Sequence, residues 1–225
     1  MALLLDIIKY LSIPNFFNAP LAVRSIPRIL AGFPMSIALT AISFILALIL
    51  GLFLTLAQLS KRKWLHYPAR AFISFMRGVP MLVLLFIIYF GFRADALPAA
   101  VIAFTINCSA FVSEVYRSSF SAVDYGQWEA AYSLGLPYRK VISKIIFPQA
   151  FRIAIPALGN ILLDLFKGTS LAAMITVSEM FMDAQIVAGA NQDYMTIYIT
   201  IAVIYWFFCW LMTIGQTQLE HSLAK

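Results

Sequence analysis

Charged residues are scarce in this chain. Asp, Glu, Lys and Arg make up 12% of its 225 residues, whereas soluble domains contain about 25%. Hydrophobic residues reach 62%, and the mean hydropathy is +0.88. A soluble fold of this size must cover its surface with polar groups, and this chain has too few of them. The composition therefore excludes an ordinary soluble enzyme and a disordered chain, and it predicts an integral membrane protein.

Cysteine and histidine are also rare, with two of each. Cys108 and Cys209 lie within apolar runs and form no spaced motif, which excludes the disulfide framework of a small secreted domain. His66 and His221 lie outside the apolar runs, and the sequence around them holds no cluster of nucleophiles or metal ligands. We therefore expect no catalytic residue, no metal site and no enzymatic activity.

The net charge of +6 comes from basic residues that gather in two stretches. The first contains Lys61, Arg62, Lys63 and Arg70, and the second contains Arg117, Arg139, Lys140, Lys144 and Arg152. Cytoplasmic loops of membrane proteins carry an excess of Lys and Arg. The pattern therefore predicts the topology of the chain and argues against nucleic acid as a partner.

Long apolar runs separate these basic stretches. A helix needs about 20 apolar residues to cross a bilayer, and the chain offers about five such runs, at residues 32–59, 71–92, 98–116, 153–190 and 194–214. Polar residues interrupt the fourth run, so we expect a broken span there. With the basic stretch after the first run and the loop 117–152 in the cytoplasm, the N-terminus lies outside and the C-terminus inside. The sequence predicts an all-α integral membrane protein with a transmembrane domain over residues 32–220.

Residues 1–31 form a separate N-terminal segment. Pro14, Pro20 and Pro27 exclude a continuous spanning helix there. Arg24 and Arg28 lie among apolar residues, a pattern typical of an amphipathic helix at the membrane surface. We therefore expect an interfacial segment before the first span.

The polar loop between the third and fourth runs has the pattern of two short helices. Asp124 is suited to an N-cap, and Gln127 three residues later completes a capping-box pattern. Gly135 stands where a C′ glycine belongs. Pro137 suits the first turn of a second helix, and we expect Pro148 to end that helix. From this pattern alone, a solvated linker without a partner is as good an interpretation as a docking element.

Several motifs occur in a fixed order along the chain. They are Arg77-Gly78-Val79-Pro80, Ser113-Glu114-Val115-Tyr116-Arg117, Glu129-Ala130-Ala131 followed by Gly135 and Pro148, and Lys167-Gly168-Thr169-Ser170-Leu171. The third resembles the EAA loop of ABC importer permease subunits. The others are similar to motifs of the polar amino acid permeases, and the resemblance covers about residues 30–220. The chain therefore resembles the transmembrane subunits of type I polar amino acid importers.

This resemblance implies a permease subunit that forms the translocation path and couples to a separate ATPase. In that family two permease subunits pair, two cytoplasmic ATPase subunits dock on the EAA loops, and an extracytoplasmic binding protein delivers the amino acid. The implied location is the bacterial cell membrane, with lipid around a multi-pass chain. The sequence has no G-x-x-x-x-G-K-[ST] phosphate loop. We therefore expect this chain to bind no cofactor, and ATP and Mg to belong to the partner ATPase.

The resemblance also assigns roles to residues of the EAA loop. Glu129 and Arg139 would make polar contacts at the rim of the ATPase interface. Close packing against the ATPase would come from Ala130, Ala131 and Gly135.

Ionisable residues within a span are costly in lipid and are functional candidates by default. Arg77 is interpreted either as a gate or scaffold contact or as a side chain that extends to the interface. Asp164 and Lys167 are three residues apart, so they share a helical face. They either line the pathway of the solute or only neutralise each other.

The same apolar run holds further candidates for the pathway or its gate. Gly168, followed by Thr169 and Ser170, predicts a break with exposed backbone groups, because broken helices line binding sites in transporters. The family usually has Asp or Asn in place of Gly168, so the substrate preference of relatives need not transfer. Glu179 lies toward the outer end of the run, where it is a candidate contact for the binding protein or the outer gate.

The alternative function is a stand-alone secondary transporter or channel for a small polar solute. Such a protein has no use for a capped docking loop between its spans, and five spans are few for an independent carrier. The sequence leaves open which amino acid is carried, whether the spans themselves bind it, and whether the paired permease is an identical copy or a homologue.

Overall fold

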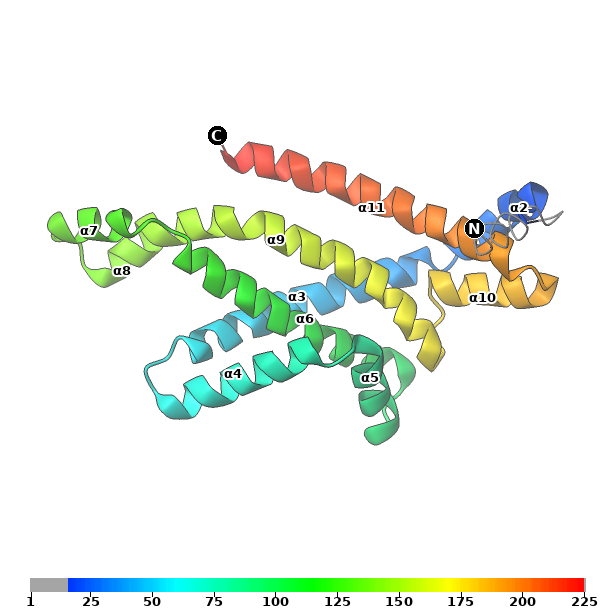
Figure 1. Ribbon diagram of the computed structural model, residues 1–225, viewed down its shortest axis with the longest axis horizontal. Helices are drawn as coiled ribbons and strands as arrows, with labels where there is room; N and C mark the ends of the chain where they lie inside the picture. The colour runs from blue at the N-terminus through cyan, green and yellow to red at the C-terminus, as the bar shows by residue number, and fades with distance from the viewer. Residues whose placement is uncertain (1–15, 225) are drawn as a thin grey trace, which may run out of the picture.

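The computed structural model describes residues 16–224, and that part of the chain is helical with no strand. Figure 1 shows the helices running mostly along the long axis of the molecule. In chain order they are α2 (Ala19–Leu30), α3 (Phe33–Gln58), α4 (Lys63–Gly78), α5 (Met81–Phe86), the π-helical η1 (Ile87–Gly91), α6 (Ala96–Ser121), α7 (Tyr125–Ser133), α8 (Tyr138–Val141), the π-helical η2 (Ile142–Ile146), α9 (Phe147–Gly168), the 3₁₀-helical η3 (Thr169–Ile175), α10 (Met180–Asn191) and α11 (Tyr194–Ala224).

Helices α3 and α6 form the most extensive contact in the bundle. The buried face of α3 is a stripe of mostly small residues at intervals of three or four, which are Ser36, Leu39, Thr40, Ser43, Ala47, Gly51, Thr55 and Gln58. A Cβ at Gly51 would lie 2.6 Å from Cγ1 of Val112 on α6. Lipid tails are as apolar as leucine, so helices in a bilayer associate through such close packing and not through hydrophobic burial. The stripe therefore sets the distance between the two backbones.

The chain passes five times along the long axis. Among the described residues, four helices are long and apolar enough to cross a membrane, and the bent pair formed by α4 with α5 and η1 gives a fifth when the pair is counted as one span. Helices α3, α6 and α11 run toward the end of the molecule that carries α7 and α8, whereas α4 and α9 run away from it (Figure 1). The all-α fold with about five spans is confirmed.

The second span differs from the straight helix expected at residues 71–92. Helix α4 already begins at Lys63, and the chain bends by 108° before it continues as α5. Pro80 disfavours helical backbone in the residue before it, and Val79 has φ −90° and ψ 131°, an extended conformation. The bend therefore follows directly from the Val79-Pro80 pair.

The fourth span also differs from the expected broken segment at residues 153–190. Pro156 and Gly159 lie inside α9 without ending it, and Tyr138–Ile175 is one spanning segment. The helix tightens to 3₁₀ geometry after Gly168 and ends at Thr176, whose φ of 66° is left-handed. The interruption thus occurs after the span, and α10 is a separate short helix.

Helix α2 carries the polar and apolar faces expected for the N-terminal segment. Ala22, Ser25 and Ile29 are buried against α10 and α11, whereas Arg24 and Arg28 are exposed. Its position at a membrane surface stays a prediction. The remainder of the segment, residues 1–15, lies outside the described residues.

The turn between α2 and α3 generates a testable prediction. A Cβ at Gly32 would lie 2.5 Å from the backbone nitrogen of Met180 and 2.7 Å from the carbonyl oxygen of Glu179. We expect Gly32→Ala to lower the free energy of unfolding by roughly 1–3 kcal/mol, because backbone atoms cannot move aside as side chains do. Thermal unfolding of the purified chain in detergent measures this change.

The matched control is Gly215→Ala in α11, where an added Cβ would meet nothing within 4 Å. Alanine favours a helix over glycine by about 1 kcal/mol, so this variant should be neutral or slightly stabilised. Equal melting temperatures for the two variants would contradict the prediction.

Candidate functional site

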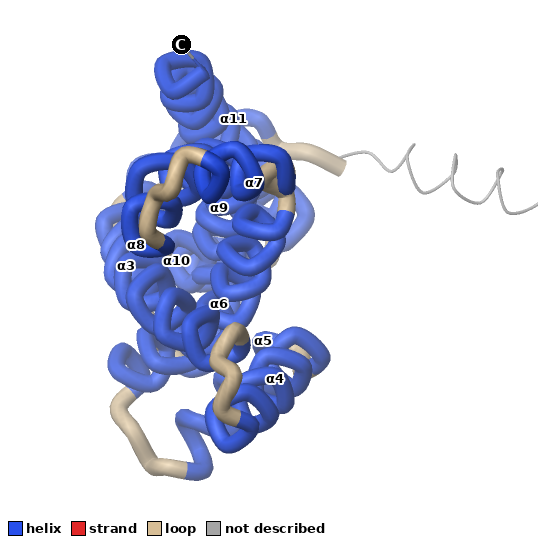
Figure 2. The backbone as a smooth tube through the Cα atoms, turned by 90° about the vertical axis from the view of Figure 1, so that its left-hand side faces the viewer, coloured by secondary structure: helices blue, strands red, loops and turns tan. Residues whose placement is uncertain are grey.

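The loop at one end of the bundle contains two short helices joined by a glycine turn. Figure 2 shows α7 and α8 together at that end of the molecule. The Asp124 carboxylate caps α7 by accepting a hydrogen bond from the Gly126 N–H at 2.7 Å. Gly135 has a φ of +70° and donates its N–H to the Tyr132 carbonyl at 2.9 Å. The N-cap and the left-handed glycine are confirmed.

Two details of the loop differ from expectation. The Gln127 side chain accepts a hydrogen bond from Gln149 at 3.2 Å, and no capping-box bond back to Asp124 is present among the described contacts. Pro148 does not end the second helix, because it occupies the first turn of α9, where a missing N–H removes no bond within α9. The π-helical turn η2 directly precedes it. The loop therefore runs into the fourth span without a break.

The residues assigned to the ATPase interface divide into two groups. Glu129, Ala130, Gly135 and Arg139 are exposed. Ala131 is only 2% exposed and packs in the protein's own cluster with Val123, Val141, Ile146 and Ala150. The expected contact of Ala131 with the ATPase is therefore corrected, because its side chain holds α7 against the bundle.

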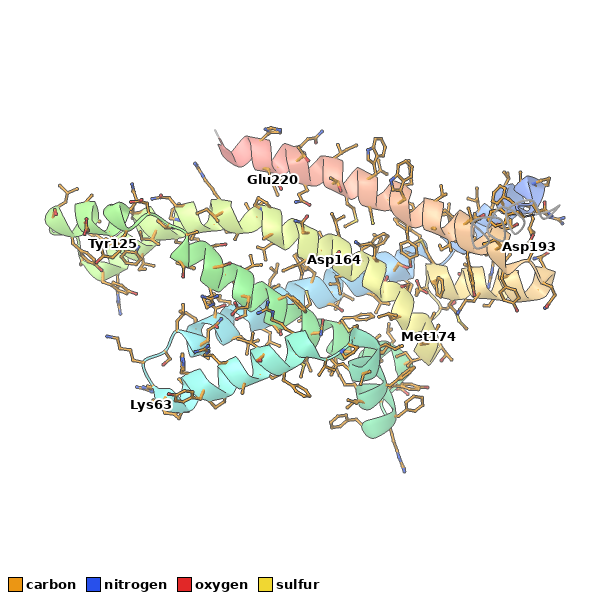
Figure 3. All side chains as sticks on the ribbon, viewed as in Figure 1. Lys63, Tyr125, Asp164, Met174, Asp193 and Glu220 are labelled. Atoms are coloured by element: carbon orange, nitrogen blue, oxygen red, sulfur yellow. The ribbon has the colours of Figure 1, made fainter. Side chains whose placement is uncertain are left out.

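Asp164 and Lys167 form an ion pair on the surface of α9. The Lys167 Nζ lies 2.8 Å from Oδ1 of Asp164. The Asp164 side chain is 75% exposed and the Lys167 side chain is 55% exposed. Figure 3 places Asp164 midway along the bundle. A charged pair at this depth cannot face hydrocarbon without a large cost. We infer that this face of α9 meets water or another protein chain.

A cavity of about 260 Å³ opens beside Asp164 and Gly168. Asn107 and Phe111 of α6 and Met81 of α5 also line it. The sequence interpretation missed these three residues. Asn107 is a polar residue within an apolar span, and that signal alone identifies it as a candidate.

Thr169 and Ser170 do not expose a broken backbone. Their hydroxyls donate to the carbonyl oxygens of Phe166 and Lys167, both at 2.7 Å, and Thr169 is fully buried. The break expected at Gly168 is wrong, because the 3₁₀ helix η3 continues the backbone hydrogen bonding. A role of these hydroxyls in the pathway stays a prediction.

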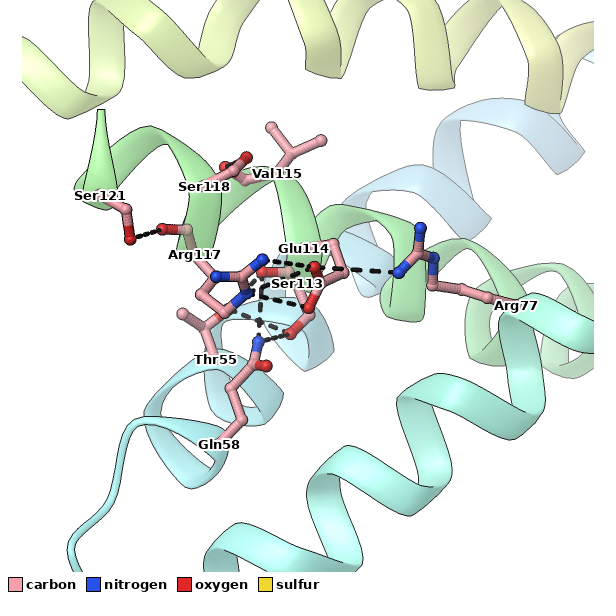
Figure 4. Close-up of polar contacts among 9 residues, drawn as sticks. All are labelled: Thr55, Gln58, Arg77, Ser113, Glu114, Val115, Arg117, Ser118 and Ser121. Atoms are coloured by element: carbon pink, nitrogen blue, oxygen red, sulfur yellow. Dashed lines mark hydrogen bonds and ion pairs between the residues drawn. The ribbon is translucent and has the colours of Figure 1, made fainter.

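Arg77 connects α4 to α6. Its Nη1 lies 3.8 Å from Oε2 of Glu114, and its guanidinium lies 5.8 Å from the centre of the Phe111 ring. Arg117 donates to the same carboxylate through Nε at 3.1 Å and Nη2 at 2.9 Å (Figure 4). Glu114 therefore joins two arginines from two helices, an arrangement that suits the scaffold interpretation of Arg77.

Glu179 is fully buried between α3, α10 and α11. Its carboxylate accepts hydrogen bonds from Ser36 Oγ at 3.2 Å, Tyr205 OH at 3.1 Å and the Met182 N–H at 2.8 Å. A buried carboxylate that accepts hydrogen bonds from three helices holds those helices together. Glu179 is not among the residues that line the cavity beside Asp164 and Gly168, and its assignment to a gate stays a prediction. Ser36 and Tyr205 were not predicted as partners of Glu179, from which they lie 143 and 26 residues away in the chain.

The chain is similar to known transport proteins over nearly its whole length. The sequence family described as "Binding-protein-dependent transport system inner membrane component" matches residues 47–225. The "Probable amino-acid ABC transporter permease protein YckA" of Bacillus subtilis (strain 168) is 47% identical, over 92% of this chain and 94% of that protein. The "L-cystine transport system permease protein TcyB" of the same strain is 42% identical, over 88% of each chain.

Solved structures carry the same fold. The structure titled "Crystal structure of an amino acid ABC transporter with histidines" has a TM-score of 0.85 at 32% identity, covering 89% of this chain and 96% of that one. A chain of the MetNI methionine ABC transporter in an inward-facing conformation has a TM-score of 0.70 at 18% identity, covering 93% of this chain and 100% of that one, and supports the fold alone. With four-fifths of its length matched by the family and relatives aligned over about nine-tenths of it, the chain belongs to the binding-protein-dependent transport system inner membrane components.

Proposed function

We propose that this chain is the permease subunit of a bacterial ABC importer for polar amino acids. The observation that carries the proposal is the exposed Asp164–Lys167 pair midway along α9. A free amino acid presents an ammonium and a carboxylate, and this pair offers one partner for each. Relatives whose names specify amino acid, cystine or arginine transport support the substrate class.

The same pair supports a second permease chain as partner. One chain leaves the pair exposed, and lipid would not solvate it. A second copy or a homologue facing α9 would enclose a polar path between the two chains. The cavity beside Asp164 and Gly168 would then lie along that path.

Membership of the family brings ATPase and binding-protein partners. We place the ATPase dimer, with its ATP and Mg, against α7. Exposed large side chains cover the tip of this loop, namely Tyr125, Tyr132, Leu134 and Tyr138, and Leu134 is 77% exposed. An exposed apolar patch of this kind is typical of an interaction site. The binding protein then docks at the opposite end, near α10 and the start of α11.

The loop can transmit motion because it packs against the bundle and runs directly into the fourth span. Closure of an ATPase dimer is a rigid-body motion that displaces whatever is seated in it. Helix α7 follows α6 after three residues, and α8 continues through η2 into α9. The buried cluster around Ala131 fixes α7 to the end of α6 and to the start of α9. A push on α7 therefore reaches the pair on α9 without passing through a flexible segment.

The glycine turn provides a test of this coupling. We expect Gly135→Trp to abolish uptake while the chain still inserts in the membrane, because an indole at the exposed turn obstructs docking and the φ of +70° strains any bulky residue by about 1–2 kcal/mol. Radiolabelled amino acid uptake and co-purification of the ATPase measure the two effects.

Gly135→Asn is the matched control, since asparagine tolerates left-handed backbone. It should retain most of the uptake. Normal docking and uptake in Gly135→Trp would count against the assignment of the loop.

The ion pair provides the second test. We expect Asp164→Asn to reduce uptake at least tenfold, because it leaves the Lys167 ammonium without its partner and removes one charge from the path. Initial rates of uptake in proteoliposomes containing the whole transporter measure this loss.

The charge-swapped double variant, Asp164→Lys with Lys167→Asp, separates the two interpretations of the pair. It retains an ion pair three residues apart but reverses its polarity. Uptake should remain low if the pair contacts the solute. Recovery to the wild-type rate would show that the two residues only neutralise each other.

A further inference from the structure

A second cavity, of about 500 Å³, lies between α4 and the ends of α3 and α6. Most of its lining is polar or charged, and its residues are Gln58, Leu59, His66, Arg70, Ile73, Ser74, Arg77, Glu114 and Arg117. It lies toward the end that carries α7 and α8 and is separate from the cavity beside Asp164. Its chemistry therefore needs its own explanation.

The lining carries more positive than negative charge. Arg70, Arg77 and Arg117 are cationic, and Glu114 is the one acid among the lining residues. Glu114 is already engaged by Arg117 and Arg77. Arg70 makes no ion pair with any residue in the described part of the chain. The cavity thus holds arginine groups that an additional anion would neutralise.

The spacing of the polar residues directs them to one face of α4. His66, Arg70, Ser74 and Arg77 follow one another at intervals of three or four residues. His66 also donates from Nδ1 to the Gln58 carbonyl oxygen at 2.5 Å, which holds the start of α4 against the end of α3. The face is therefore fixed in position before any ligand arrives.

The depth of the cavity identifies the kind of anion. Trp64 and Tyr67, beside it on α4, are 68% and 61% exposed, and such aromatics mark the headgroup level of a bilayer. Leu59 and Ile73 give the cavity an apolar part. Basic pockets between spans on the cytoplasmic side suit anionic lipid headgroups, and arginine binds phosphate through two parallel hydrogen bonds.

We propose that this cavity binds the phosphate of an anionic phospholipid from the cytoplasmic leaflet, with Arg70 as its principal ligand. The lipid would join α4 to the ends of α3 and α6 at the depth where α4 enters the membrane. This site is additional to the transport function and does not depend on the identity of the solute.

Lipid retention by the purified transporter complex, permease with its ATPase, tests the proposal. The complex in detergent is mixed with equal amounts of dioleoyl phosphatidylglycerol and dioleoyl phosphatidylcholine, and the bound lipid is counted by native mass spectrometry. We expect the wild type to retain phosphatidylglycerol preferentially. Arg70→Gln should weaken that binding at least tenfold, the effect of losing a charge-assisted, two-bond contact with the phosphate, and should leave phosphatidylcholine unchanged.

Lys61→Gln is the matched control, because it removes the same charge from the neighbouring loop and does not line the cavity. It should change phosphatidylglycerol binding by less than twofold. Arg70→Lys keeps the charge without the bidentate geometry and should bind with intermediate strength. This variant keeps the test valid if Arg70→Gln is poorly inserted.

Three results would overturn the proposal. One is equal retention of the two lipids by the wild type, which would mean that protein or water fills the cavity. Another is unchanged phosphatidylglycerol binding in Arg70→Gln and Arg70→Lys. The third is complete displacement of the lipid by 10 mM inorganic phosphate, which would identify a site for the free anion.

Discussion

The structure depends on the close approach of α3 to α6. Neither helix gains much from leaving lipid for protein, so the contact must come from close packing and from hydrogen bonds that side chains make across it. Gly51 of α3 leaves room for the side chain of Val112 on α6. Two turns further, Gln58 donates to Ser113 Oγ at 2.8 Å. Helices α4 and α9 pack against both members of this pair, and α11 packs in turn against α9.

The bilayer also explains where the polar residues lie. Several ionisable groups within the bundle have a partner that their own helix or a neighbour supplies. Glu179 receives its donors from three elements, whereas Glu114 gathers two arginines. Asp164 and Lys167 pair with each other, yet both side chains remain exposed. That contrast separates the residues that hold the fold together from the exposed pair to which a pathway role is proposed.

Local signals predicted the parts of this structure that depend on a few neighbouring residues. Asp124 and Gly135 were sufficient to place both ends of α7, because caps are determined within one turn of helix. The prolines were harder to interpret. Pro80 bends the chain where the sequence suggested a straight span, although the restriction on Val79 could have revealed the bend. Pro156 lies within α9 without breaking it, since its effect depends on which neighbour satisfies the freed carbonyl groups.

The long-range contacts could not be predicted from the sequence alone. Nothing near Ser36 or Tyr205 indicates that both donate to Glu179, because α3, α10 and α11 must first pack together. Ala131 is a second example of a contact that the sequence alone could not predict. Its small size suits a docking surface and an internal contact equally well, and only the position of η2 decides between them.

The unbroken run from Tyr138 to Ile175 has a mechanical consequence. At roughly 1.5 Å per residue, its 38 residues span about 55 Å, more than the thickness of the hydrocarbon core. One continuous helix therefore runs from the end of the bundle that carries α7 past the charged pair on α9. A tilt of this helix about its middle moves its two ends in opposite directions. Under the transport function proposed above, opening one mouth of the path and closing the other would then be a single event.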